Sequence, residues 1–186
     1  MRSGEPETCA ASLITLLKER GLVLATAESC TGGMVASLLT DIAGSSAVFW
    51  GGVIVYSDES KRRLLGVDRK LIESRGAVSL EVARAMAEGI LKVSGADFSL
   101  AITGIAGPAG ATPEKPVGFV CFAWADRNAE SITESRQFEG DRAAIRAAAA
   151  AHALSRAAEF AIGVPGVARD TTVDIDKPMG PVYSDR

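Results

Sequence analysis

The alternation of short strand-like runs with longer helix-like segments is the feature that most constrains how this chain folds. Residues 22–25 form a compact apolar run, and residues 48–56 and 98–103 have the composition of further strands. The segments between them have the apolar spacing and the terminal signals of helices. Interleaved helices and strands are typical of an α/β domain, in which helices cover the faces of a sheet.

Capping residues and glycines mark where the helices begin and end. The strand-like segments 117–125 and 131–138 follow one another around the turn 126–128, which favours an antiparallel pair and hence a mixed sheet. The predicted fold class is therefore α/β, a three-layer α/β/α sandwich with a mixed sheet of about five strands. The predicted helices span residues 7–20, 31–41, 59–65, 68–76, 79–93 and 141–162.

The length of 186 residues fits one domain. Hydrophobic residues make up 47% and charged residues 23%, which is ordinary for a soluble globular protein. We place the domain at residues 1–163. Residues 164–186 contain several prolines and glycines with little periodicity, so we expect a flexible or surface-draped tail.

Several function classes are disfavoured by composition. No apolar run approaches the roughly 18 residues that span a bilayer, and the N-terminus has no apolar signal segment. The three cysteines are too few for a disulfide framework and lack metal-ligand spacing, so we expect a reducing cytoplasm, no metal and no cofactor. The net charge of −3, without a Lys/Arg tract, disfavours duplex nucleic acid as a partner.

The segment 27–33, Ala-Glu-Ser-Cys-Thr-Gly-Gly, places a hydroxyl and a thiol where a strand turns into a helix. Backbone N–H groups at a helix start can hold an anion and can stabilise charge that develops on a nucleophile. Ser29 is the first candidate nucleophile, with helix capping as an equally weighted alternative. Cys30 is the rival, although a small buried residue is its simpler role. We expect only one of the two to face the cleft.

A nucleophilic serine needs a base, and the chain has a single histidine. His152 lies in an Ala-rich helical segment, where a packing role is favoured, so a Ser–His–Asp triad is disfavoured. A lysine of lowered pKa can serve instead, and Lys61 follows a strand end, where ligand crevices open in α/β folds. Tyr56 can donate a hydrogen bond to the same centre. A solvated lysine and a packed tyrosine are the alternatives.

A second strand-to-loop junction lies at residues 103–108, Thr-Gly-Ile-Ala-Gly-Pro. Its glycines allow close approach of a ligand, and its amides can form an anion nest, although an ordinary surface loop is the alternative. Arg142 and Arg146 share one face of the last predicted helix. Arg142 lies near the helix start, where a phosphate is favoured. The alternative is a solvent-exposed position without a ligand, and this alternative fits Arg146 better than Arg142.

Together these motifs resemble the CinA C-terminal family, and within it the members that hydrolyse nicotinamide nucleotides. The resemblance covers roughly residues 7–162, and several motifs occur in one order. The chain begins at the first helix of that region, as in the stand-alone form of the family. The motifs are Ala27–Gly33, Gly44-Ser45-Ser46, Tyr56-Ser57, Lys61, Gly76–Ser79, Thr103–Pro108, Pro116-Val117-Gly118 and Gly140-Asp141-Arg142.

The resemblance implies hydrolysis of nicotinamide mononucleotide to nicotinate mononucleotide and ammonia, in pyridine-nucleotide recycling. It implies a cytoplasmic homodimer with Ser29 as nucleophile, Lys61 as base and Tyr56 assisting. Arg142 would contact the phosphate or the transition state. The implied substrate-binding residues are Glu28, Cys30, Thr31, Gly32, Gly33, Thr103, Gly104, Ile105, Ala106, Gly107 and Arg142.

The chain departs from the family pattern at three positions. Asp58 stands where we expect Asn, and Ala109 and Ala111 replace glycine or polar residues. These departures bear on loop shape and substrate preference. Two other functions stay open from the sequence: a non-catalytic nucleotide- or partner-binding module, and an amidohydrolase for a related substrate.

Overall fold

The computed structural model describes residues 5–128 and 130–166. A single mixed sheet with the strand order β2-β1-β3-β4-β5 forms its centre. β1 pairs in parallel with β2 and β3, whereas β4 is antiparallel to β3 and β5, as predicted. Most of the predicted tail, residues 167–186, lies outside the described residues. The strands are β1 Leu24–Glu28, β2 Phe49–Ile54, β3 Phe98–Gly104, β4 Phe119–Asp126 and β5 Ile132–Gln137.

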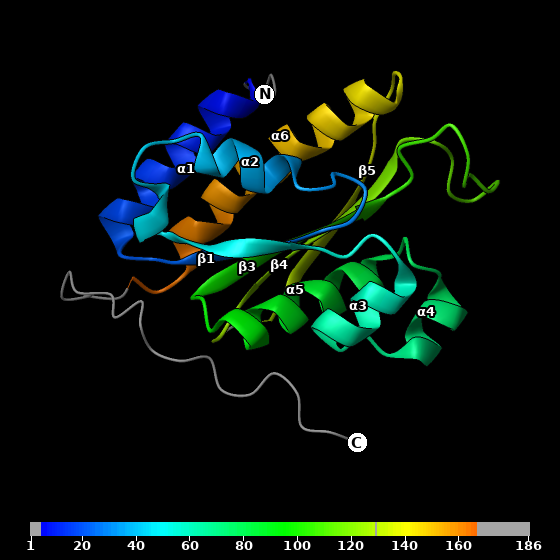
Figure 1. The fold of residues 1–186 in the computed structure, drawn as a ribbon, viewed down its shortest axis with the longest axis horizontal. Coiled ribbons are helices and arrows are strands. Elements are labelled where there is room, and N and C mark those ends of the chain that lie inside the picture. Colours follow the sequence, from blue (N-terminus) through cyan, green and yellow to red (C-terminus); the bar gives the residue numbers. More distant parts are fainter. Residues whose placement is uncertain (1–4, 129, 167–186) are drawn as a thin grey trace.

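Helices cover both faces of the sheet, which confirms the three-layer α/β/α prediction (Figure 1). One layer holds α1, α2 and α6, and the opposite layer holds α3, α4 and α5. Predicted caps are present at Ser79, Asp68 and Asp141, whose side chains accept hydrogen bonds from the first turns of their helices. The helices are α1 Pro6–Arg20, α2 Met34–Thr40, α3 Asp58–Leu65, α4 Arg69–Arg75, α5 Leu80–Ser94 and α6 Arg142–Gly163, with a 3₁₀ turn at Ser45–Ala47.

The two faces of the sheet carry side chains of different size. Along β4, Phe122 and Trp124 join the core under α1 and α6, while Cys121 and Ala123 face the core under α5. This division follows from the alternation of side chains along a strand. Small residues on the α5 side let that helix approach the sheet closely, and Ser99 donates a hydrogen bond to the Ala87 carbonyl of α5.

The first strand and the helix after it begin later than predicted. β1 continues to Glu28, which pairs with Ile54 on one side and Ile102 on the other. The predicted helix start at Thr31 is wrong, because Gly32 and Gly33 have φ of 61° and 94°, which a right-handed helix does not allow. Residues 29–33 therefore form a tight turn between strand and helix.

Gly89 sets the contact between α5 and the end of α3. A Cβ at this position would overlap the Leu65 carbonyl oxygen and lie 2.9 Å from the Leu65 Cβ. The close approach therefore needs a residue without a side chain. The same contact also positions Lys61, because α3 carries that residue.

Gly89→Ala should destabilise the protein by about 2 kcal/mol or more, because backbone overlap outweighs the gain in helix propensity of up to about 1 kcal/mol. Urea denaturation measures the change. Gly163→Ala is the matched control, since a Cβ there meets nothing within 4 Å and should leave stability unchanged or raised. Equal effects of the two substitutions would contradict the packing argument.

Candidate active site

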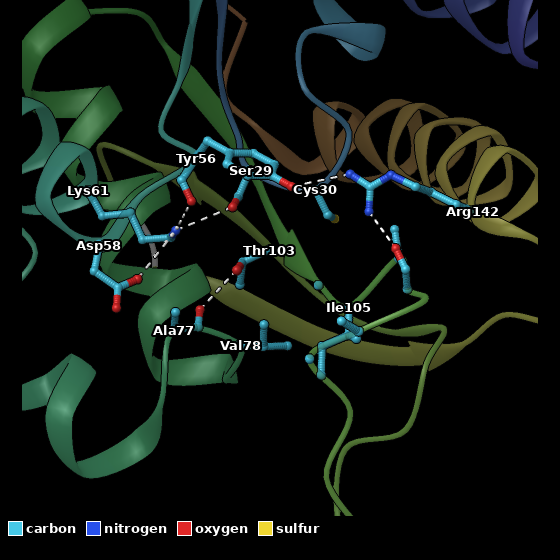
Figure 2. Close-up of a pocket in the computed structure, with 15 residues that line it drawn as sticks. Ser29, Cys30, Tyr56, Asp58, Lys61, Ala77, Val78, Thr103, Ile105 and Arg142 are labelled. Carbon is cyan, nitrogen blue, oxygen red and sulfur yellow. Dashed lines mark hydrogen bonds and ion pairs between the residues drawn. The ribbon is translucent and has the colours of Figure 1, made fainter.

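The carboxyl ends of the parallel strands meet over one cavity (Figure 2). Ser29 follows β1, Tyr56 lies just after β2, and Thr103 and Gly104 end β3. The cavity measures about 280 Å³. Its wall contains Ser29, Cys30, Tyr56, Asp58, Lys61, Ala77, Val78, Thr103, Gly104, Ile105, Ala106, Gly107, Ala109, Gly110 and Arg142.

Ser29 and Lys61 are in contact at the floor of this cavity. Lys61 Nζ lies 3.3 Å from Ser29 Oγ and donates a hydrogen bond to the Tyr56 carbonyl oxygen, also at 3.3 Å. Only 1% of Lys61 and 7% of Ser29 is exposed. Burial lowers the pKa of Lys61, and the Asp58 carboxylate, 3.9 Å away, partly offsets that effect. The sequence prediction that paired these two residues is consistent with this geometry.

The start of α3 fixes the position of Lys61. Ser57 caps the helix by accepting a hydrogen bond from the Ser60 amide, and the Ser60 hydroxyl accepts one from the Ser57 amide. This reciprocal pair is a capping box, which fixes the first helical turn. Lys61 lies at the end of that turn, so its side chain enters the cavity in a defined direction.

Cys30 lines the same cavity as Ser29, so the expectation that only one of them faces it is wrong. Burial raises the pKa of the Cys30 thiol to about 12. Because the thiolate is the reactive form of cysteine, Cys30 is poorly suited to attack at neutral pH. Ser29 has an amine in contact with its hydroxyl and needs no prior ionisation.

Tyr56 and Arg142 close one side of the cavity. Arg142 Nη2 donates a hydrogen bond to the Tyr56 hydroxyl at 3.2 Å, and Arg142 Nη1 donates to the Gly107 carbonyl at 2.7 Å (Figure 2). The phenol of Tyr56 thus faces Arg142 rather than Lys61, and it is the Tyr56 carbonyl that contacts the amine. These bonds join the end of β2, the loop after β3 and the start of α6.

The loop after β3 also lines the cavity, from Thr103 to Gly107. The Thr103 hydroxyl donates a hydrogen bond to the Ala77 carbonyl at 2.9 Å, which ties this strand end to the segment before α5. A Cβ at Gly104 would lie 2.8 Å from Val120, so the backbone passes close to β4 there.

The amides of Gly32 and Gly33 already donate hydrogen bonds within the protein, so these two groups are not free to hold the anion expected there. The buried Glu28 carboxylate accepts hydrogen bonds from the amides of Gly33, Val35 and Ala36 at 2.9, 3.1 and 2.8 Å. The Gly32 amide donates to the Ser29 carbonyl. Four predicted substrate-binding residues are not among those that line this cavity, and they belong to the turn beside it: Glu28, Thr31, Gly32 and Gly33.

Arg146 was interpreted as a solvated residue, and that interpretation is wrong. Its Nε donates to the Cys30 carbonyl at 3.2 Å and its Nη2 to the Thr31 carbonyl at 2.7 Å. The residue therefore fixes the backbone just after Ser29. The spacing of four from Arg142 was the available signal, because it places both guanidinium groups on the face of α6 that meets this turn.

His152 lies away from this cavity, in agreement with its predicted packing role. Its ring contacts Phe122 and Phe138, and Nε2 lies 3.4 Å from a carboxylate oxygen of Glu134. Within residues 5–128 and 130–166, no group of three or more His, Cys, Asp or Glu side chains is placed to hold a metal ion. In that same part of the chain, no helix combines the length and apolarity needed to cross a membrane.

An α/β domain with a buried serine–lysine pair over a strand-end cavity is the class of protein that this geometry defines. The chain belongs to the CinA C-terminal domain family, whose sequence profile matches residues 6–160. The nicotinamide-nucleotide amidohydrolase PncC of Escherichia coli K12 is 51% identical over 138 residues, which cover 74% of this chain and 84% of that protein. A CinA-like protein of Geobacter sulfurreducens is 54% identical over 139 residues, or 75% of this chain.

Solved structures of the family share this fold. The competence/damage-inducible protein CihA of Agrobacterium tumefaciens has a TM-score of 0.80 at 43% identity, covering 87% of this chain and 96% of that one. The competence damage-inducible protein A (ComA) of Klebsiella pneumoniae has a TM-score of 0.83 at 36% identity, covering 86% and 99%. The chain spans only between 32% and 39% of the length of the longer curated relatives it matches.

Glu28→Gln should lower the free energy of unfolding by about 1–3 kcal/mol, because an amide NH₂ replaces one of two oxygens that accept backbone N–H groups. Urea denaturation measures this loss. Glu19→Gln, at an exposed position of α1, is the control and should change stability little. A Glu28→Gln variant as stable as its parent would show that the buried carboxylate does not hold the turn.

Proposed function

We propose that the protein is a serine amidohydrolase that converts nicotinamide mononucleotide to nicotinate mononucleotide and ammonia. The observation that carries the proposal is the 3.3 Å contact between Lys61 Nζ and Ser29 Oγ in a buried site. The identity to the E. coli amidohydrolase supports this choice of substrate. Nucleophile and base within hydrogen-bonding reach are the signature of covalent acyl transfer.

The chemistry begins with Lys61 in its neutral form. Lys61 accepts the hydroxyl proton as Ser29 Oγ bonds to the carboxamide carbon, giving a tetrahedral intermediate. The intermediate collapses by breaking the C–N bond, and the Lys61 ammonium gives its proton to the nitrogen that leaves as ammonia. Water then attacks the acyl-enzyme with Lys61 again as base, which releases the carboxylate product and restores the Ser29 hydroxyl.

The remaining walls provide substrate contacts in this proposal. Arg142 is assigned to the phosphate, because a guanidinium binds phosphate with several donors and lies at the start of α6. Thr103 to Gly107 line the same cavity and provide further contacts. The family resemblance further implies a homodimer, a cytoplasmic role in pyridine-nucleotide recycling, and a domain boundary near residue 163, all of which stay predictions.

A non-catalytic nucleotide-binding module is the competing function. Such a module needs donors for a phosphate, but it has no need for a buried amine against a serine hydroxyl. Burial of Lys61 disfavours its charged form and so weakens it as a phosphate ligand, while it suits a base. The geometry therefore favours catalysis over binding alone.

Ser29→Ala should reduce ammonia release from nicotinamide mononucleotide by about a thousandfold or more, because the nucleophile is lost. A coupled ammonia assay measures the rate. Cys30→Ala is the matched control at the neighbouring position and should retain most of the activity. Loss of activity in Cys30→Ala together with retention in Ser29→Ala would assign the role to the thiol.

The rate should also depend on the protonation of Lys61. Because burial lowers the pKa of Lys61, kcat/KM should rise as pH increases through that lowered pKa and fall as the amine becomes protonated at lower pH. In Lys61→Met this rise should disappear, and kcat should drop by about 10²–10⁴-fold. A pH profile that is unchanged in Lys61→Met would contradict the role as base.

A further inference from the structure

Asp58 places a carboxylate on the cavity wall beside the base. Its Oδ1 lies 3.9 Å from Lys61 Nζ, and 59% of the Asp58 side chain is exposed against 2% for Lys61. Figure 2 shows Asp58 and Lys61 on one side of Ser29 and Arg142 on the other. The separation of 3.9 Å exceeds a hydrogen bond, so the two side chains interact through their charges.

The charge balance at this wall changes when the base becomes active. A protonated Lys61 neutralises Asp58, but activation of Ser29 requires Lys61 to lose its proton. Among the described residues Lys61 is the cation that lies within 4.0 Å of Asp58. The other groups near Lys61 cannot serve as a cation for Asp58, because the Cys30 thiol is uncharged and the Tyr56 phenol is bound by Arg142.

We propose that Asp58 exchanges cation partners, pairing with the Lys61 ammonium in the empty site and with the positively charged ring of a pyridinium amide in the occupied site. This inference rests on the proposed function. The carboxamide carbon must reach Ser29 Oγ, and the pyridinium ring is one bond away from that carbon. The ring therefore lies inside the cavity whose lining includes both Lys61 and Asp58, and the exchange places it next to Asp58.

The exchange makes Asp58 a specificity-determining residue for the charge of the ring. A cationic ring beside Lys61 disfavours the ammonium and so promotes the neutral base, while Asp58 compensates the new charge. An amide on an uncharged ring provides neither effect. Two consequences follow: a preference for the cationic ligand, and release of a proton when that ligand binds.

The test measures binding in the Ser29→Ala protein, which cannot turn the ligand over. The ligands are nicotinamide mononucleotide and the same nucleotide with a reduced, uncharged ring. Titration calorimetry should show a preference for the cationic ring that Asp58→Asn lowers by roughly two- to fivefold, the range of a partly exposed charge pair. Glu59→Gln is the matched control, because Glu59 shares the first turn of α3 but pairs with Arg62 and Arg63.

Calorimetry in two buffers of different ionisation enthalpy gives the second readout. Below the Lys61 pKa, the cationic ligand should release a proton on binding, the uncharged ligand should not, and Asp58→Asn should reduce the release. A merely structural role for Asp58 would weaken both ligands equally and leave proton release unchanged.

The outcomes separate the two proposals. A ligand preference that Asp58→Asn leaves unchanged, or equal proton release by both ligands, overturns the exchange even if the wild type produces ammonia. Charge-selective binding that depends on Asp58 supports the exchange. If the wild type then releases no ammonia, the amidohydrolase proposal is overturned and the exchange is not. Failure of both ligands to bind overturns the exchange, and ammonia release by the wild type still decides the amidohydrolase proposal separately.

Discussion

The buried Glu28 carboxylate is the interaction on which the candidate site depends. It accepts three backbone hydrogen bonds from the start of α2, so the chain can leave β1, turn within five residues and enter the helix. A buried carboxylate is tolerated only when its oxygens are satisfied in this way. Ser29 follows directly, so its hydroxyl is positioned by the strand register on one side and by this carboxylate on the other.

Arg146 acts on the same turn from α6. Its guanidinium donates to the carbonyls of Cys30 and Thr31, while Glu28 holds the amides that follow. Arg146 thus binds backbone carbonyl groups of the turn, and Glu28 binds the backbone amide groups at its end. The backbone after Ser29 is therefore restrained both by a side chain from the sheet and by one from α6, which is the support that a preorganised site needs.

The fold was predictable because its signals are local. Alternating strand and helix patterns, the caps at Ser79 and Asp141, and the adjacent last strands fix the element order and the mixed sheet. Element ends were less predictable near residue 31, where Gly32 and Gly33 adopt positive φ in a turn that Glu28 and Arg146 both bind. The contact from Arg146 joins segments that are distant in the sequence, and no local pattern carries that information.

The site was predictable to a similar degree. Ser29 and Lys61 could be singled out because each follows a strand end and because the chain lacks a suitable histidine. Arg142 could be singled out because it lies at a helix start. The structure places all three on one cavity. The solvated position predicted for Arg146 was wrong, although a charged residue on a helix is usually solvated. Its role depends on which face of α6 contacts the turn at residues 29–33, and only tertiary packing decides that.

The same burial explains why a hydroxyl rather than a thiol suits this pocket. Loss of water disfavours charge of either sign, so it raises the pKa of Cys30 to about 12 and lowers the pKa of Lys61. A thiolate paired with an ammonium would need two charges where the environment resists both. A neutral serine beside a neutral lysine needs none until the transition state forms. Desolvation therefore affects the two neighbouring candidate nucleophiles differently, and the Asp58 carboxylate at the rim raises the pKa of Lys61 against the effect of burial.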